Sequence, residues 1–297
     1  MNNTNYKKRQ VMKSWNTLIR IVGGAVLAAS VSSAHAAATP DPGDYTALPA
    51  GTDLTMLYGQ HLHGDQLYAN GNKVALPAEL DLNLNLGLYR QVHFMKLGGY
   101  TIDPQFIIPF ARQTTGFSGA RSSGIGDIIV GGTLWTIADL PGGEHLGYSV
   151  FLTAPTGAAK TQGFAISDNR WAADLQVGYI KTFLPKWTVD LIGQAEFYQD
   201  RRDTGSSKDP LVRAFVHVRY HLGDASHLAA SLRYATGAKE ALNGSILASS
   251  KRDSNIGLTW ASFLTKQVQV QAQYSQDLHV ESGPRLKTLA LRALYAY

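Results

Sequence analysis

The sequence contains no cysteine, and only 16% of its 297 residues are Asp, Glu, Lys or Arg. The absence of cysteine excludes disulfides and thiolate-ligated zinc sites. After residue 36 no run of 18 uncharged apolar residues occurs, which excludes a transmembrane helix there. Amphipathic helical patterns are scarce, whereas 29 glycines, 14 tyrosines and frequent period-two alternation indicate many short strands.

The net charge of +5 is confined to the start of the chain, because no acidic residue precedes Asp41. From residue 37 onward, 261 residues carry 22 basic and 22 acidic side chains. A neutral chain of this kind is not expected to bind nucleic acid. The five excess cations are Lys7, Lys8, Arg9, Lys13 and Arg20.

The first 36 residues have the pattern of a signal peptide. The cationic start is followed by an apolar run over 21–29 and by Ala34-His35-Ala36, a small-x-small cleavage site. A retained membrane anchor is the alternative, but the run is shorter than the roughly 20 residues that span a bilayer. We therefore predict export with cleavage after Ala36.

Alternation is clearest over Glu79–Arg90, where leucine occupies every even position from 80 to 88 and the odd positions are mostly polar. Because successive side chains of a strand point to opposite faces, this segment is predicted to be a strand. Similar patterns predict twelve strands in all, at 52–61, 79–90, 98–111, 124–136, 145–155, 169–182, 187–199, 210–222, 227–236, 252–263, 267–277 and 286–297.

The connections between these strands alternate in length. Short turns follow strands 4, 6, 8 and 10, and mostly longer loops follow the odd strands. A soluble β-sandwich has no reason to sort its loops in this way, whereas an outer-membrane barrel does. We predict an all-β, antiparallel twelve-stranded barrel over 52–297, in the outer membrane of a Gram-negative bacterium, after a periplasmic lead at 37–51.

Charged residues within the predicted strands avoid the apolar face of their own strand, as contact with lipid would require. We predict that these residues face the lumen and contact the solute. Acids on strands 2–7 and arginines on strands 8–12 would then either set up a field across the lumen or pair and close it. The residues are Asp81, Asp103, Asp127, Asp174, Asp190, Glu196, Arg213, Arg219, Arg233 and Arg292.

The chain ends in an apolar face that closes on Tyr295 and Tyr297. This face resembles the C-terminal signal that the bacterial barrel-assembly machinery recognises, although that signal usually ends in Phe. We therefore expect the assembly machinery and outer-membrane lipid as partners. Aromatic residues near strand ends, among them Trp135, fit interfacial girdles. Pro104 fits poorly inside a strand, because it cannot donate to a ladder, and predicts a bulge or a later strand start.

A set of short motifs, in this order along the chain, resembles a family of outer-membrane barrels associated with the meta-pathway of phenol degradation. The resemblance covers Gly43 to Tyr297 and implies uptake of aromatic compounds. The motifs are Gly43-Asp44-Tyr45, Leu48-Pro49-Ala50-Gly51-Thr52, Tyr68-Ala69-Asn70-Gly71, Gln105–Phe110, Ser123-Gly124-Ile125-Gly126-Asp127, Trp135, Pro155-Thr156-Gly157 and Asn169-Arg170-Trp171.

No catalytic motif of a hydrolase, metalloprotease or phosphate-binding enzyme occurs, and His217 is predicted to face the lumen. We therefore predict a channel for small hydrophobic or aromatic solutes that is not an enzyme and needs no cofactor or metal. The alternatives are a barrel enzyme acting on lipid, similar to a phospholipase, and a purely structural barrel.

The predicted cleavage can be tested on protein isolated from outer membranes. Mass spectrometry should find a mature N-terminus at Ala37, because Ala34 and Ala36 occupy the two small positions of the site. Ala36→Leu should leave Met1 in place, whereas the control Ala38→Leu should not. An intact Met1 in soluble wild-type protein would contradict export.

Overall fold

The computed structural model describes residues 39–116, 119, 121–157 and 167–297. The predicted signal peptide and its cleavage site therefore lie outside the described residues. Within the described ranges there is no helix that is both long enough and apolar enough to cross a membrane.

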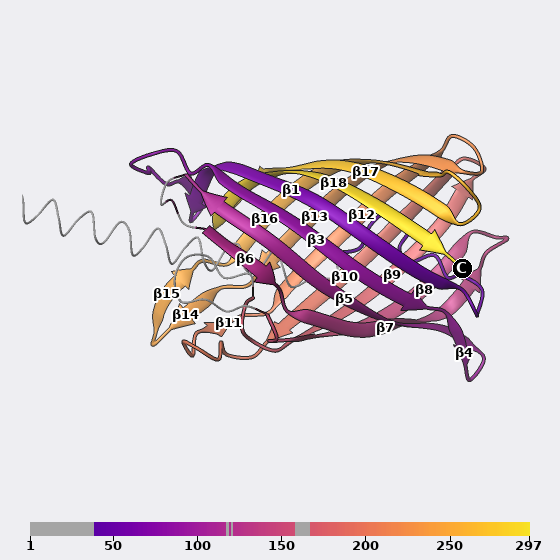
Figure 1. Ribbon diagram of the computed structural model, residues 1–297, viewed down its shortest axis with the longest axis horizontal. Coiled ribbons are helices and arrows are strands. Elements are labelled where there is room, and N and C mark those ends of the chain that lie inside the picture. The colour runs from indigo at the N-terminus through magenta and orange to yellow at the C-terminus, as the bar shows by residue number, and fades with distance from the viewer. Residues whose placement is uncertain (1–38, 117–118, 120, 158–166) are drawn as a thin grey trace, which may run out of the picture.

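Twelve long antiparallel strands form one sheet that closes on itself, which confirms the predicted barrel (Figure 1). Each strand pairs with its neighbours along the chain, and the last pairs with the first from Leu54↔Ala296 to Tyr68↔Gly283. The strands are β1 (Asp53–Ala69), β3 (Leu82–His93), β5 (Tyr100–Thr115), β7 (Ile128–Asp139), β8 (Glu144–Ala154), β9 (Ala172–Leu184), β10 (Trp187–Tyr198), β12 (Leu211–His221), β13 (Ser226–Gly237), β16 (Lys251–Phe263), β17 (Val268–His279) and β18 (Gly283–Ala296).

The predicted sorting of the connections is also confirmed. One end of the barrel carries the short turns, and β1 begins and β18 ends there. The other end carries the long loops, with one exception: only three residues join β17 to β18. At the short-turn end, the backbones of Asp53 and Tyr297 form two hydrogen bonds to each other, with N–O distances of 2.9 and 3.0 Å. The connections between the long strands contain six short strands: β2 (Asn72–Lys73), β4 (Met95–Leu97), β6 (Arg121–Ile125), β11 (Ser207–Lys208), β14 (Glu240–Leu242) and β15 (Ser245–Ala248).

Pro104 lies within β5, so the expected bulge or later strand start is wrong. It is opposite Gly132 of β7, and on its other side it falls between the β3–β5 ladder and the β4–β5 ladder. Phe94, the residue between β3 and β4, instead bonds through its backbone to Gly51 and Thr52. The proline therefore coincides with a break in the ladder, where a missing N–H costs little.

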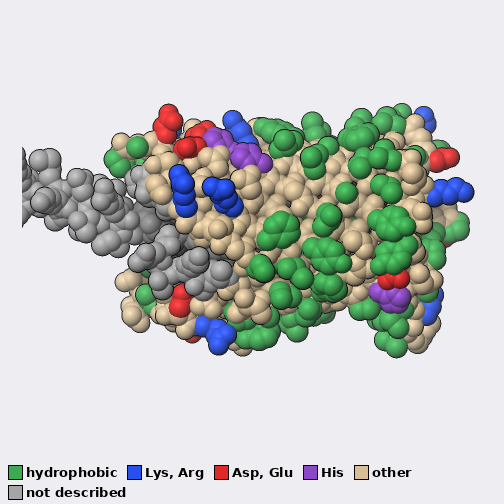
Figure 2. Space-filling view, in the orientation of Figure 1, with side chains coloured by type: hydrophobic (Ala, Val, Ile, Leu, Met, Phe, Trp, Pro, Cys, Tyr) green, Lys and Arg blue, Asp and Glu red, His purple; other side chains and the backbone are tan. Residues whose placement is uncertain are grey.

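The outer surface of the barrel is apolar over most of its length. Figure 2 shows hydrophobic side chains gathered over the middle and right of the view, with charged groups toward the two ends. Trp135 is not part of this surface, contrary to the interfacial position expected for it. Its side chain is 1% exposed and stacks on Phe94 inside the barrel, with ring centroids 5.5 Å apart.

The two faces of β3 are reversed relative to the expectation for Asp81. The leucines at 82, 84 and 86 point into the barrel and pack in one cluster with Leu62 of β1. Asp81 precedes the strand, is exposed, and accepts a hydrogen bond from Asn83 Nδ2 at 2.7 Å. The prediction that Asp81 faces the lumen is therefore wrong, because the lumen here is lined by leucine and the outer face is polar.

The chain end offers a test of the assembly signal. Tyr295 and Tyr297 are exposed and stacked 5.5 Å apart, and Tyr297 completes the pairing with Asp53. Deletion of 295–297 should lower the amount of folded barrel in the outer membrane, whereas Tyr297→Phe loses only a 3.1 Å hydrogen bond from Gln91. Heat-modifiable mobility on gels measures the folded fraction. Equal folded amounts for the deletion and Tyr297→Phe would contradict the assembly role.

Candidate functional site in the barrel lumen

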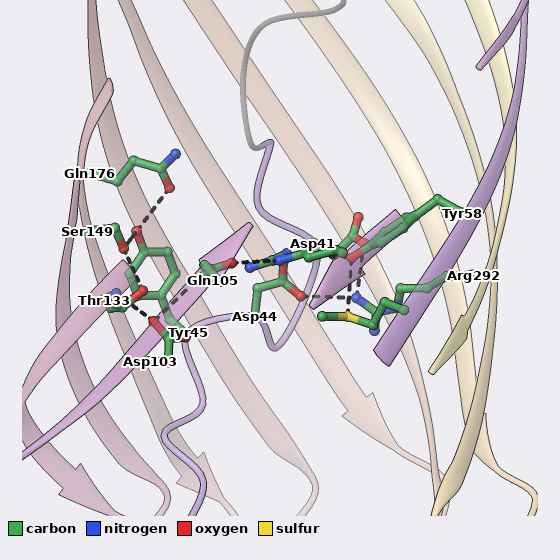
Figure 3. Close-up of polar contacts among 12 residues, drawn as sticks. Asp41, Asp44, Tyr45, Tyr58, Asp103, Gln105, Thr133, Ser149, Gln176 and Arg292 are labelled. Carbon is green, nitrogen blue, oxygen red and sulfur yellow. Dashed lines mark hydrogen bonds and ion pairs between the residues drawn. The ribbon is translucent and has the colours of Figure 1, made fainter. Parts of the chain in front are cut away.

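The described residues before β1 run through the inside of the barrel from one wall to another (Figure 3). Asp41, Asp44 and Tyr45 all bond to side chains that point inward from the strands. We call residues 39–52 the N-terminal segment, and it contains the described part, 39–51, of the periplasmic lead expected at 37–51. The expectation is wrong for these residues, because the segment supplies acids and a ring for which the lumen has partners.

The acids of the N-terminal segment meet two arginines of the wall. Arg292 Nη1 of β18 lies 3.1 Å from Asp41 and 3.0 Å from Asp44. Arg90 Nη1 of β3 lies 3.1 Å from Asp44, and Gln273 of β17 donates to Asp41 at 2.8 Å. Both guanidinium groups are nearly buried, so their charges need these carboxylates.

Tyr45 anchors the same segment on the opposite wall. Its hydroxyl bonds Ser149 Oγ at 2.8 Å and Gln176 Oε1 at 3.0 Å, and its ring is 4% exposed. The ring lies over Gly178 of β9, where a Cβ would come within 2.2 Å of it. Trp135 Nε1 donates to the carbonyl oxygen of Tyr45 at 3.0 Å. The wall is therefore shaped around this side chain.

The predicted lumen charges pair between neighbouring strands. Arg213 of β12 lies 3.1 Å from Glu196 of β10, and Arg219 bonds Asp190 through two nitrogens at 2.8 and 3.0 Å. These strands are adjacent in the sheet, so the acids and arginines do not face each other across the lumen. Asp190 also accepts a bond from the backbone N–H of Gly43 at 2.7 Å.

The other predicted site residues have different surroundings. Asp103 and Asp174 point inward and are held by uncharged donors, Thr133 and Gln105 for the first and Gln176 and Gln194 for the second. Asp127 holds the loop between β8 and β9, because it accepts hydrogen bonds from Ser167 Oγ and from the backbone N–H groups of Gly157 and Asp168. Arg233 of β13 lies 3.5 Å from Asp277 of β17.

Four residues of this interior were missed from the sequence: Asp41, Asp44, Arg90 and Asp277. The two acids belong to a segment without strand pattern, so nothing placed them inside the barrel. Arg90 could have been found, because it shares the parity of the leucines at 80–88 and would be an unpaired charge on a lipid-facing surface.

A cavity of about 250 Å³ lies within the lumen beside the N-terminal segment. One side of its lining is apolar and comes mainly from β3, β5 and β7, with Leu86, Leu88, Ile107 and Ile129. The other side is polar and comes from β13, β16 and β17, including Arg233 and Asn255. Thr39 and Asp41 of the N-terminal segment also line it.

At the long-loop end, a buried ion cluster ties three loops together. Asp168 lies 2.9 Å from Lys208 and 3.3 Å from Arg170, and Arg170 lies 2.7 Å from Glu240. Burial by itself would raise the pKa of Asp168, but Lys208 and Arg170 outweigh it and hold the pKa below its usual value. Asp168 therefore stays ionised at neutral pH, and the cluster links the loops at the rim of the lumen.

The barrel, the apolar outer surface and the lined interior define the class of outer-membrane barrel channels. A channel of known structure from Pseudomonas putida F1 is 33% identical to this chain, with a TM-score of 0.81, and covers 87% of this chain and 100% of its own. The β-domain of the Bordetella autotransporter Brka shares the fold alone, at 13% identity and a TM-score of 0.54, over 84% of this chain and 100% of its own.

The sequence model of the family described as "Putative MetA-pathway of phenol degradation" matches residues 64–293. The chain belongs to this family of outer-membrane channels, as its motifs indicated. Among curated protein sequences, none matches this chain.

The anchoring of the N-terminal segment can be tested by removing its charges. In the Asp41→Asn, Asp44→Asn double variant, Arg90 and Arg292 lose their carboxylates, so the segment should loosen. Single-channel conductance should rise, and selectivity should shift toward anions because two cations are then uncompensated. The control Asp200→Asn, Asp224→Asn removes two exposed carboxylates. Identical conductance in the wild type and in both variants would show that the N-terminal segment does not limit the passage of ions through the lumen.

The loop cluster predicts a pH dependence. Asp168→Asn should destabilise the barrel by about 3–5 kcal/mol, because Lys208 is left buried without a charge partner. Since the folded pKa is lowered, this stability is complete above the unfolded value of about 3.9 and is lost as pH falls through the folded pKa. The melting-temperature difference from the exposed control Asp200→Asn should thus hold at neutral pH and shrink only in strong acid. A difference that vanishes near pH 6 would contradict this.

Proposed function

We propose that this channel admits small hydrophobic and aromatic solutes, and that it serves the uptake step ahead of ring-cleaving degradation of phenols. The family description supports the link to phenol degradation. The lumen supports the solute class, because its apolar wall offers contact to a ring rather than hydrogen bonds to a sugar.

The observation that carries the proposal is the inward leucine and isoleucine wall of β3, β5 and β7. Leu86, Leu88, Ile107 and Ile129 line the cavity, and burial of apolar surface contributes about 25 cal/mol per Å². A sugar of similar size would leave hydroxyl groups without partners against this wall, which costs about 1–3 kcal/mol per group. The side of the cavity formed by β3, β5 and β7 therefore favours an apolar ring.

The proposed function also requires a defined orientation in the outer membrane, export and insertion. The long loops face the outside of the cell and the short turns face the periplasm, where β1 and β18 begin and end. The signal peptide is removed after Ala36, and Tyr295 and Tyr297 present the terminal signal to the assembly machinery. Lipid contacts the apolar outer surface.

The protein acts without catalysis, and it is not a lipid-cleaving barrel. An enzyme of that kind needs its serine and histidine on the lipid side, but His217 is buried in the interior with its Nδ1 2.7 Å from Ser231 Oγ. Purified protein with calcium should release no fatty acid from phospholipid vesicles. Hydrolysis that is lost in His217→Ala would overturn this assignment.

Uptake by a deletion strain complemented with variants tests the solute class. Leu86→Asn should reduce accumulation of labelled phenol, because it places an amide on the apolar wall, and should leave uptake of a small sugar unchanged. Leu86→Met is the matched control, since it keeps an apolar side chain of similar volume and should retain activity. Equal phenol accumulation in the deletion strain and in the wild type would refute the proposal.

A further inference from the structure

The arginines inside the barrel differ in how much of the guanidinium group is free. Arg90, Arg213, Arg219 and Arg292 have side chains that are 6–14% exposed, and each lies 2.8–3.1 Å from a carboxylate. Arg233 is 37% exposed, and its sole ion pair among the described residues is the 3.5 Å contact with Asp277. In the described part of the chain, only Asp277 accepts a hydrogen bond from Arg233, so the other guanidinium donors have no partner there.

Arg233 is not the only group that bonds Asp277. Its Oδ1 accepts a bond from Asn255 Nδ2 at 3.0 Å, and its Oδ2 accepts one from the backbone N–H of Leu286 at 2.8 Å. These donors keep both oxygens of Asp277 hydrogen-bonded when Arg233 turns to another acceptor, and an anionic ligand would then share the guanidinium with Asp277. The contact is weak enough to be exchanged.

The free donors of Arg233 open onto the cavity described above. Arg233 and Asn255 stand on its polar side, and Leu86, Leu88, Ile107 and Ile129 form the apolar side. Other charges of the lining are already paired: Arg213 with Glu196, and Asp41 with Arg292. The polar side also holds Asp277 and the ion pair of Lys251 with Asp253, which are 3.2 Å apart. A ligand that fills this space meets one apolar wall and, on the polar side, Arg233 as the most exposed arginine of the barrel interior.

We propose that this cavity is a binding site for small aromatic carboxylates, with Arg233 as the residue that recognises the carboxylate. The planar guanidinium matches a carboxylate with two parallel hydrogen bonds, which an uncharged phenol hydroxyl cannot match. The ring lies against the leucine and isoleucine wall. The volume of about 250 Å³ is below the usual range of about 300–1,000 Å³ for ligand sites, which favours a single ring.

This inference rests on the proposed function, because it names the member of the aromatic class that the same lumen holds best. It separates the two parts of the ligand between two walls. The apolar wall accepts any single ring, whereas Arg233 distinguishes a ring with an anionic group from one without.

The test is equilibrium dialysis of the full-length mature barrel in detergent against labelled benzoate, phenol and acetate, with empty micelles as the blank. Wild type should bind benzoate more tightly than phenol, and acetate least, because acetate lacks the ring. Arg233→Gln should weaken benzoate binding by about tenfold or more, the usual size of a hydrogen bond to a charged group, and should leave phenol binding unchanged. The benzoate affinity of Arg233→Lys should lie between those of the wild type and Arg233→Gln, since lysine keeps the charge but lacks the planar guanidinium group.

Arg252→Gln is the matched control, because it removes the same charge from an exposed position on the neighbouring strand β16. Heat-modifiable mobility shows that each variant is folded. If benzoate binds wild type and Arg233→Gln equally while phenol also binds, the role of Arg233 is refuted and the aromatic channel stands. If neither aromatic binds and phenol uptake also fails, the proposed function falls as well.

Discussion

The ion pairs between the N-terminal segment and the barrel wall are the contacts on which the interior depends. Arg90 and Arg292 come from strands on either side of β1, and both are nearly buried. Without Asp41 and Asp44 they would be two uncompensated cations in a space of low polarity, which is strongly unfavourable. The acids therefore hold the segment in the lumen, and the segment in turn forms part of the cavity wall.

Charge pairing elsewhere in the barrel has a consequence for selectivity. Arg213 with Glu196 and Arg219 with Asp190 are pairs between adjacent strands, so each charge is cancelled close to its origin. Such pairs produce little field across the lumen, and the alternative of opposite walls with opposite charge loses its basis. Discrimination between solutes then depends on the leucine wall and on the charges that are not closely paired, namely Arg233 and the acids Asp103 and Asp174.

Most of the fold could be predicted from the sequence, because strands, their number and the sorting of turns and loops are local properties. Alternation over 79–90 identifies a strand whatever surrounds it. Alternation defines two faces, however, and does not say which face is inside. For β3 the rule that apolar residues contact lipid pointed the wrong way, because the neighbouring inward residue Leu62 makes the lumen apolar there. Trp135 was misplaced for a related reason, since proximity to a strand end does not distinguish an interfacial ring from a buried one.

The site was less predictable than the fold because its groups come from distant parts of the chain. Asp41 and Arg292 are 251 positions apart, and no periodic pattern links an irregular segment to the last strand. Their pairing follows only once the barrel is closed and its interior has to be neutralised. The same reasoning explains Arg233: its parity placed it in the lumen, but its availability depends on Asn255 and Leu286 having already satisfied Asp277. Competition among several donors for one carboxylate is a property of the folded interior, and it is this competition that leaves a cation free to meet a solute.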